Sequence, residues 1–243
     1  MIDSGDQRAL YFVGERNINI VETLIDLRQP HVLQHPHSRA VMAGFLYRPN
    51  VSSCLMVGLG GGALVRFINH RFPEVRLDVV EIDPAVVTVA RDYFGVAAGP
   101  PTRIFVEDGR DYLERTPERY DLILIDAHLY PSDRTDSTGH PLSLKTERFY
   151  RSIRERLNPG GVVMFNVIGG PDARGYLDSI RRAFAASDVY RPKQTGNVLV
   201  FAAPRAPLAS EAALRERARE FDRRGDYGFS FEGLLDDRDP RPE

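Results

Sequence analysis

The sequence predicts an α/β fold: a doubly wound, mostly parallel seven-stranded sheet with an antiparallel last strand and a small N-terminal β appendage. Two observations predict this class. Short apolar runs of strand type alternate with stretches whose apolar residues recur at helical spacing, which is typical of repeated βα units that cover both faces of a sheet. Near the C-terminus, extended runs at 189–191 and 197–202 are spaced as a hairpin, which favours one antiparallel strand at an edge of the sheet.

The first 36 residues predict the β appendage. Residues 1–7 are polar and are expected to be loose. Strands are expected at 9–13, at 18–25 after a turn at 14–17, and, as a short extended piece, at 32–34. An appendage of this length is too short to be an independent domain.

Residues 37–204 predict the main domain, in which strands and helices alternate. The parallel strands are expected at 54–58, 76–81, 103–107, 120–126 and 162–167. Helices are expected at 38–47, with Ser38 as a candidate N-cap, at 62–72, 84–94, 109–115 and 145–157, where Pro159-Gly160-Gly161 follows as a breaker, and at 173–186. Residues 205–243 predict a charged helix at 210–224 and then a tail of low order.

Composition limits the classes of function. With 42% apolar and 27% charged residues in 243, the chain is expected to bury a sizeable core in one domain with a small appendage. The formal net charge of −2 gives no basic footprint, so nucleic acid is not expected as the main partner. No apolar run approaches the ~20 residues that cross a bilayer and no signal peptide opens the chain, so a cytoplasmic protein without a membrane partner is expected. The single cysteine, Cys54, is expected to be a core residue.

The stretch from Cys54 to Ile68 predicts a strand, a glycine turn and a helix. Its glycines are Gly58, Gly60, Gly61 and Gly62. Glycine lets the backbone approach a ligand closely and turn with positive φ. The following helix directs free N–H groups at the space above the turn. The turn is therefore a candidate site for a nucleotide-like ligand.

Polar side chains follow the other predicted strands. Glu81, Ile82 and Asp83 end the second strand, where a carboxylate can accept hydrogen bonds from both ribose hydroxyls. The later strand ends carry Asp108 and Gly109, then Asp126 with a loop containing His128, Tyr130 and His140, and finally Asn166. Ligands bind outside the carboxyl ends of parallel strands, so this rim is the predicted functional site.

Five motifs occur in order along the chain: VGLGGG at 57–62, VVEIDP at 79–84, EDGRDYL at 107–113, YDLILID at 120–126 and RLNPGGV at 156–162. Together they resemble the S-adenosylmethionine-dependent methyltransferase fold, a Rossmann-like fold, over roughly residues 30–203. Within that fold they are similar to the spermidine synthase (polyamine aminopropyltransferase) branch. The resemblance implies S-adenosylmethionine, or its decarboxylated form, as cofactor.

The resemblance also implies roles for single residues. Glu81 would hold the ribose hydroxyls, Asp108 beside Gly109 the adenine amino group, and Asp126 would lie by the sulfonium and the incoming amine. A carboxylate there stabilises the cation and can orient or deprotonate an amine. The cofactor-binding candidates are Gly58, Gly60, Gly61, Gly62, Glu81, Ile82, Asp108, Gly109 and Asp126, and the catalytic candidates are Asp126, His128 and Tyr130.

The chain departs from the spermidine synthase pattern at several places. Spermidine synthases carry an Asp inside the glycine turn, where this chain has Gly61, and a second Asp three residues after the strand-four Asp, where it has Leu129. Their tyrosine near Pro36–His37 has no clear counterpart here. A turn carboxylate would repel the carboxylate of full S-adenosylmethionine by several kcal/mol at ~4 Å, and the decarboxylated form lacks that group. Methyl transfer to an unidentified small-molecule or peptidyl acceptor is therefore the preferred interpretation.

Other interpretations stay open. An aminopropyltransferase acting on a polyamine-like amine would need Asp133 or Asp136 to fold back and replace the missing anchor. A non-catalytic binding or assembly module would keep the fold without the activity, and a nicotinamide enzyme is the least favoured alternative. The exposed β appendage is a plausible homodimer surface.

No metal site is predicted. His31, His35 and His37 are evenly spaced, but Pro36 interrupts regular presentation, and neither a cysteine pair nor a nearby carboxylate completes a ligand set. Their spacing alone is not typical of a metal centre.

Overall fold

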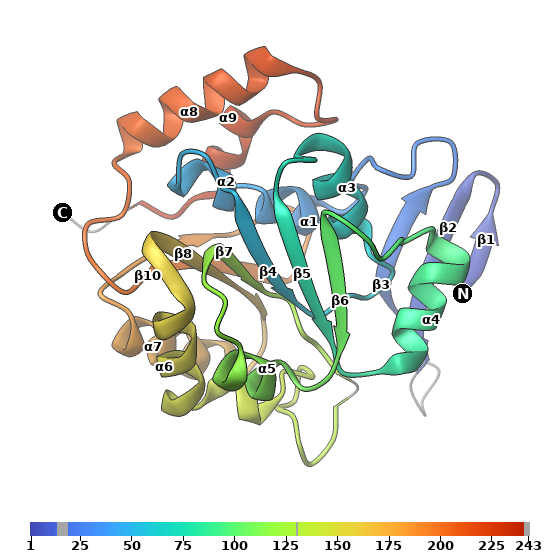
Figure 1. Cartoon of the computed structure of the whole chain (residues 1–243), viewed down its shortest axis with the longest axis horizontal. Helices are drawn as coiled ribbons and strands as arrows, with labels where there is room; N and C mark the ends of the chain where they lie inside the picture. Colours follow the sequence, from blue (N-terminus) through green and yellow to red (C-terminus); the bar gives the residue numbers. More distant parts are fainter. Residues whose placement is uncertain (14–18, 130, 241–243) are drawn as a thin grey trace.

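The computed structural model describes residues 1–13, 19–129 and 131–240 (Figure 1). The predicted turn at 14–17 and the catalytic candidate Tyr130 therefore lie outside the described residues. Within the described ranges, no helix is long and apolar enough to span a membrane.

A seven-stranded sheet forms the centre of the molecule, in the order β6-β5-β4-β7-β8-β10-β9. Its strands are β4 (Ser53–Val57), β5 (Arg76–Glu81), β6 (Thr102–Val106), β7 (Tyr120–Ile125), β8 (Leu157–Ile168), β9 (Ala186–Tyr190) and β10 (Asn197–Ala203). Strands β4 to β8 pair in parallel, and β10 pairs antiparallel with both β8 and β9. The predicted fold class is confirmed, and β10, the last strand in the chain, lies beside the edge strand β9.

Helices cover both faces of the sheet (Figure 1). One face packs against α1 (Pro36–Val41), α2 (Gly44–Tyr47), α3 (Ala63–Arg71), α4 (Pro84–Phe94), α8 (Glu211–Arg224) and α9 (Phe231–Leu234). The other packs against α5 (Gly109–Arg115), α6 (Glu147–Arg156) and α7 (Ala173–Ala183). Successive residues of a strand point to opposite faces, so Met56 joins the first core while Leu55 and Val57 join the second. Burial on both faces explains why these strands read as continuous apolar runs.

A second, antiparallel sheet joins β1 (Ile2–Ser4), β2 (Gln7–Val13) and β3 (Asn19–Asp26). The expectation that residues 1–7 are loose is wrong, because residues 2–4 pair with β2. The expected extended piece at 32–34 forms no strand, since those residues lie in the connection between β3 and α1. The Thr23 Oγ1 atom accepts a hydrogen bond from the Gly61 N–H at 2.9 Å, which places β3 over the glycine turn.

The predicted helix 38–47 is two helices, α1 and α2. Ser38 lies inside α1 and is buried, so it is not the N-cap. The second helix begins at Gly44, which lies so close to β7 that a Cβ there would be 3.0 Å from Leu122 Cδ1. Between the two helices the Met42 and Ala43 N–H groups donate to the carbonyl groups of Arg39 and Ala40, three residues earlier, so the α-helical pattern is interrupted there.

Three later boundaries also differ from expectation. The tail was expected to be of low order, but within 225–240 α9 and the 3₁₀ turn Leu235–Asp237 pack Phe231, Leu234 and Leu235 into the core. Apolar anchors within a polar stretch hold this segment against the sheet. Strand β8 begins at Leu157, ahead of Pro159-Gly160-Gly161, and helix α6 is preceded by a 3₁₀ turn, Leu142–Lys145.

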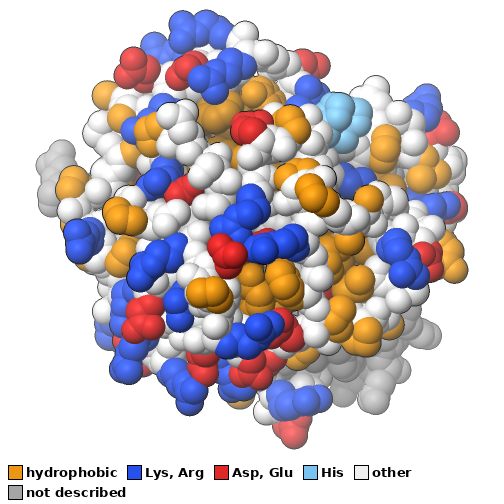
Figure 2. Space-filling view, in the orientation of Figure 1, with side chains coloured by type: hydrophobic (Ala, Val, Ile, Leu, Met, Phe, Trp, Pro, Cys, Tyr) orange, Lys and Arg blue, Asp and Glu red, His pale blue; other side chains and the backbone are white. Residues whose placement is uncertain are grey.

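In the face shown in Figure 2, charged side chains of both signs are intermixed, in keeping with the net charge of −2.

Candidate active site

A cleft of about 570 Å³ opens at the carboxyl ends of β4, β5, β6 and β7. This volume lies within the range of about 300–1,000 Å³ that is usual for small-molecule sites. The cleft brings together most of the predicted residues: Gly58, Gly60, Glu81, Ile82, Asp108, Gly109, Asp126 and His128. Neither Gly61 nor Gly62 lines it, because Gly61 is covered by Thr23 and Gly62 faces Val96.

Some glycines of the turn are required by close packing, and another faces the open cleft. Gly58 has φ +99°, and a Cβ there would be 2.1 Å from the carbonyl oxygen of Asp126. At Gly61 a Cβ would be 2.8 Å from Thr23 Cγ2. Gly60 differs, because it faces the cleft and its nearest neighbours are the side chains of Thr23 and Glu22.

Glu81 ties the turn to the end of β5. Its Oε2 atom accepts from the Leu59 N–H and its Oε1 atom from the Asp83 N–H, both at 2.9 Å. Burial raises the pKa of this carboxyl, although the two hydrogen bonds lower it. A carboxylate oxygen can accept more than one hydrogen bond, so both Glu81 oxygens can still accept hydrogen bonds from ribose hydroxyls.

Asp83 and Asp108 cap helices at the rim. The Asp83 side chain accepts from the Ala85 N–H at the start of α4, and Asp108 Oδ1 accepts from the Arg110 N–H at the start of α5, both at 2.8 Å. Capping fixes each carboxylate where it can also face a ligand. Beside Asp108, a Cβ on Gly109 would be 2.4 Å from a Val57 methyl, so this position requires glycine for packing.

A chain of amides holds Asp126. The Asn166 Nδ2 atom donates to Asp126 Oδ1 at 2.7 Å, and the Asn197 Nδ2 atom donates to Asn166 Oδ1 at 2.9 Å. Asn166 was singled out in the sequence, but Asn197 was not, because only the antiparallel pairing of β10 with β8 brings them together. Oδ2 of Asp126 receives no hydrogen bond from a described residue.

Two histidines lie beside Asp126, and their hydrogen-bond partners favour one arrangement of protons. The Ile168 N–H donates to His140 Nε2 at 2.9 Å, so that nitrogen carries no proton. The His128 Nε2 atom lies 3.3 Å from the same nitrogen, so in a hydrogen bond between the two rings His128 is the donor. If His128 is neutral, its Nδ1 atom, 3.7 Å from Asp126 Oδ1, is the basic nitrogen. Burial lowers the pKa of His128 and brings that of His140 to about 2, which favours the neutral forms.

The acids of the loop after β7 do not reach the cleft. Asp136 is held by Lys145 and by the hydroxyl and N–H groups of Thr138. Asp133 is exposed and lines neither the cleft nor the smaller cavity beside it. The anchor that an aminopropyltransferase would need is therefore not supplied by either residue.

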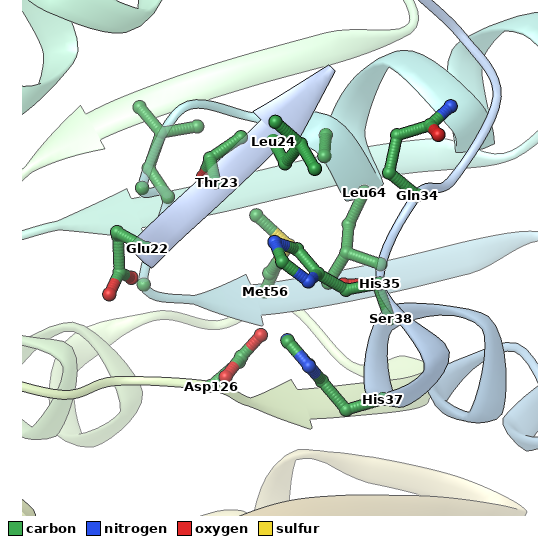
Figure 3. A pocket seen from close by; sticks show the side chains of 14 residues that line it. Glu22, Thr23, Leu24, Gln34, His35, His37, Ser38, Met56, Leu64 and Asp126 are labelled. Carbon is green, nitrogen blue, oxygen red and sulfur yellow. The ribbon is translucent and has the colours of Figure 1, made fainter. Parts of the chain in front are cut away.

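Glu22 on β3 is a site residue that the sequence reasoning missed. Its side chain lines both the cleft and a polar cavity of about 30 Å³, which also contacts Gln34, His35, His37 and Asp126 (Figure 3). Figure 3 shows the side chains of Asp126 and His37 pointing toward one another across that cavity. Burial, and then the charges of Asp126 and Glu81, raise the pKa of Glu22 to about 8. An acid inside an apolar strand run was the available signal.

Comparison with known proteins identifies the family. The profile of the spermine/spermidine synthase domain matches residues 37–168, which is more than half of the 243-residue chain. The chain belongs to this family. Its glycine turn, Glu81, Asp108 and Asp126 all lie inside the matched region.

The spermidine synthase-family relatives include two kinds of enzyme. The polyamine aminopropyltransferase of Chromobacterium violaceum is 30% identical over 233 residues, which are 94% of this chain and 84% of that protein. The eEF1A lysine and N-terminal methyltransferase homolog of Drosophila melanogaster is 31% identical over 155 residues, 61% of this chain but only 23% of that protein. The solved structure of human methyltransferase-like protein 13 in complex with SAH is 25% identical, with a TM-score of 0.71, and covers 86% of this chain and 96% of that one.

These findings confirm a spermidine synthase-like transferase with S-adenosylmethionine, or its decarboxylated form, as cofactor. The residues fit such a cofactor, because glycines leave one wall of the cleft open and carboxylates stand at three of its strand ends. Family membership alone is compatible with transfer of either a methyl or an aminopropyl group.

Proposed function

We propose that this chain transfers a methyl group from S-adenosylmethionine to a small-molecule or peptidyl acceptor. The observation that carries the proposal is the packing of the glycine turn, where Thr23 occupies the space that a side chain on Gly61 would need. The turn therefore holds no fixed carboxylate to repel that of the cofactor. Glu22 stands nearby on β3, outside the turn, and with a pKa of about 8 it is mostly protonated at neutral pH while no ligand is bound.

The order of the strands supports the assignment of the cofactor-binding residues. Asp108 follows β6, Glu81 ends β5, the glycine turn follows β4 and Asp126 follows β7, and these strands are neighbours in that order. At ~4.8 Å per strand the row spans about 15 Å, the length of an extended nucleoside with an amino-acid tail. Adenine would lie by Asp108 and Gly109, ribose by Glu81 and Ile82, and the reacting end by Asp126.

The chain's own groups can orient the acceptor and receive its proton. When bound, the cofactor would supply an electrophilic methyl group on a sulfonium. Asp126, fixed by Asn166, would orient an acceptor amine or hydroxyl through its Oδ2 atom. The His128 Nδ1 atom would take the proton that the acceptor loses, because its Nε2 proton is committed to His140. Tyr130 remains a catalytic candidate on sequence grounds.

Aminopropyl transfer is the second candidate. It is favoured by the 30% identity to a polyamine aminopropyltransferase over nearly the whole chain. In that case Glu22, rather than Asp133 or Asp136, would have to provide the acidic contact for an amine.

Calorimetry distinguishes these proposals. The purified protein is titrated with S-adenosylmethionine, its decarboxylated form and methylthioadenosine, with Glu81→Gln as the comparison. Tighter binding of the full cofactor, weakened in Glu81→Gln, supports methyl transfer. Preference for the decarboxylated form would refute it in favour of aminopropyl transfer, and binding of none of the three would leave only the non-catalytic module. Gln is preferred to Ala because it keeps one of the two backbone acceptors at this position.

A further inference from the structure

Glu22 belongs to the N-terminal sheet, yet its carboxyl group lies at the junction of the two cavities. It lines the cleft together with Gly60 and Asp126, and it lines the small polar cavity behind them. A Cβ on Gly60 would be 3.3 Å from Glu22 Oε1, so the carboxyl group lies directly against the glycine turn. Thr23, the next residue, fixes this placement through its hydrogen bond with the Gly61 N–H.

The carboxyl group of Glu22 has acidic neighbours and no described partner. Glu81 receives two backbone hydrogen bonds and Asp126 receives one from Asn166. Within the described ranges, no hydrogen bond or ion pair joins Glu22 to another residue. A partly buried carboxyl without a donor is costly in its ionised form, and the neighbouring acids increase that cost. A bound cation beside Glu22 would offset the cost of ionising this carboxyl group.

The position of Glu22 along the cleft identifies which part of a ligand it faces. Ribose at Glu81 and base at Asp108 occupy the β5 and β6 side of the rim. Glu22 lies on the opposite side, with the glycine turn after β4 and Asp126 after β7. That end of the row is where the amino-acid tail of a nucleoside cofactor would lie, and the tail carries an ammonium group.

We propose that Glu22 is the counter-ion for the ammonium group of the cofactor's tail, which it reaches from β3 and not from the glycine turn. This inference rests on the proposed binding of an S-adenosylmethionine-type cofactor in the cleft. Binding converts the Glu22 carboxylic acid into a carboxylate paired with the ligand's ammonium, and the displaced proton passes to the buffer. With a pKa of about 8 Glu22 is mostly protonated in the free protein at pH 7, so binding releases protons.

The test compares three nucleosides on wild-type protein, on Glu22→Gln and on Asp26→Asn. S-adenosylmethionine carries the ammonium and the sulfonium, S-adenosylhomocysteine only the ammonium, and methylthioadenosine neither. Asp26→Asn removes an acid from the same strand outside both cavities and is the matched control. Calorimetry at pH 7 in buffers of different ionisation enthalpy gives both the affinity and the number of protons released.

The expected result is specific to the tail. Glu22→Gln weakens S-adenosylmethionine and S-adenosylhomocysteine by about 10- to 100-fold, the range for a hydrogen bond to a charged group. It leaves methylthioadenosine unchanged and abolishes the proton release, while Asp26→Asn behaves as wild type. The inference is overturned if S-adenosylmethionine and S-adenosylhomocysteine each bind Glu22→Gln as tightly as wild type. It is also overturned if Glu22→Gln releases as many protons on binding as wild type does. Failure of wild-type protein to bind any nucleoside instead refutes the proposed cofactor site on which the inference rests.

Discussion

Substitution of Gly61 by alanine perturbs the packing of β3 on the glycine turn. The new Cβ would lie 2.8 Å from Thr23 Cγ2, 2.9 Å from Thr23 Cβ and 3.1 Å from Thr23 Oγ1. These contacts are too short to keep, so the strand and the turn must separate, and they share the hydrogen bond between Gly61 N–H and Thr23. Overpacking of this kind costs about 1–3 kcal/mol. For a chain of this size that corresponds to a fall of about 2–12 °C in Tm.

The assay is thermal unfolding of a double-mutant cycle. Thr23→Ala removes two of the three close atoms, so the double variant should be more stable than the sum of the single changes by about 0.5–3 kcal/mol. Gly175→Ala in α7 is the control, because no atom of the described residues lies within 4 Å of its Cβ position. It should be neutral or stabilising by about 0.5–1 kcal/mol. An unchanged Tm in Gly61→Ala, or strict additivity with Thr23→Ala, would refute the packing and with it the placement of Glu22.

Three further predictions concern the polar groups of the site. The raised pKa of Glu22 means that the folded state holds its proton between about pH 4.5 and 8 while the unfolded state does not, so stability should fall as pH rises through that window. Thermal scans should show a shallower fall in Glu22→Gln, and parallel pH curves would contradict the prediction. Nitrogen-15 NMR should show His128 protonated at Nε2 in wild type and in His140→Gln, because glutamine keeps a hydrogen-bond acceptor at position 140. In His140→Phe, which has no acceptor, His128 should be a mixture of both tautomers. A wild-type His128 protonated at Nδ1 would disprove the assignment. Asn197→Ala should cost about 1–3 kcal/mol in urea unfolding, because the buried Asn166 carbonyl loses its donor, and an unchanged midpoint would contradict that role.

Much of the candidate site could be predicted from short sequence motifs. The glycine turn, Glu81, Asp108 and Asp126 each follow a short buried strand, and parallel strands place their carboxyl ends on one edge. Once the alternation of strands and helices is recognised, these residues must share a rim. Gly61 and Gly62 illustrate the limit, because both belong to the turn but neither lines the cleft.

The sequence predictions were wrong where the local sequence pattern favours one structure and the folded chain adopts another. The tail at 225–240 has a polar composition typical of loose chain, yet Phe231 and Leu234 anchor it to the core. Helix 38–47 has continuous apolar periodicity, yet it is two helices, the second of which begins at Gly44. In the tail, a few apolar contacts with distant residues outweigh the preference of the segment itself.

By itself the sequence determined the α/β class, the alternation of strands and helices in the main domain, and the four strand ends that carry the cleft, because strand and turn preferences are short-range. Only the tertiary structure decided what faces those ends. Glu22 is nearly forty residues from the glycine turn that it contacts, and Asn197 lies about thirty residues beyond the Asn166 that it orients. Such contacts depend on how the N-terminal sheet docks and how β10 pairs, and the favourable burial that drives both depends on the whole packed core rather than on any local run.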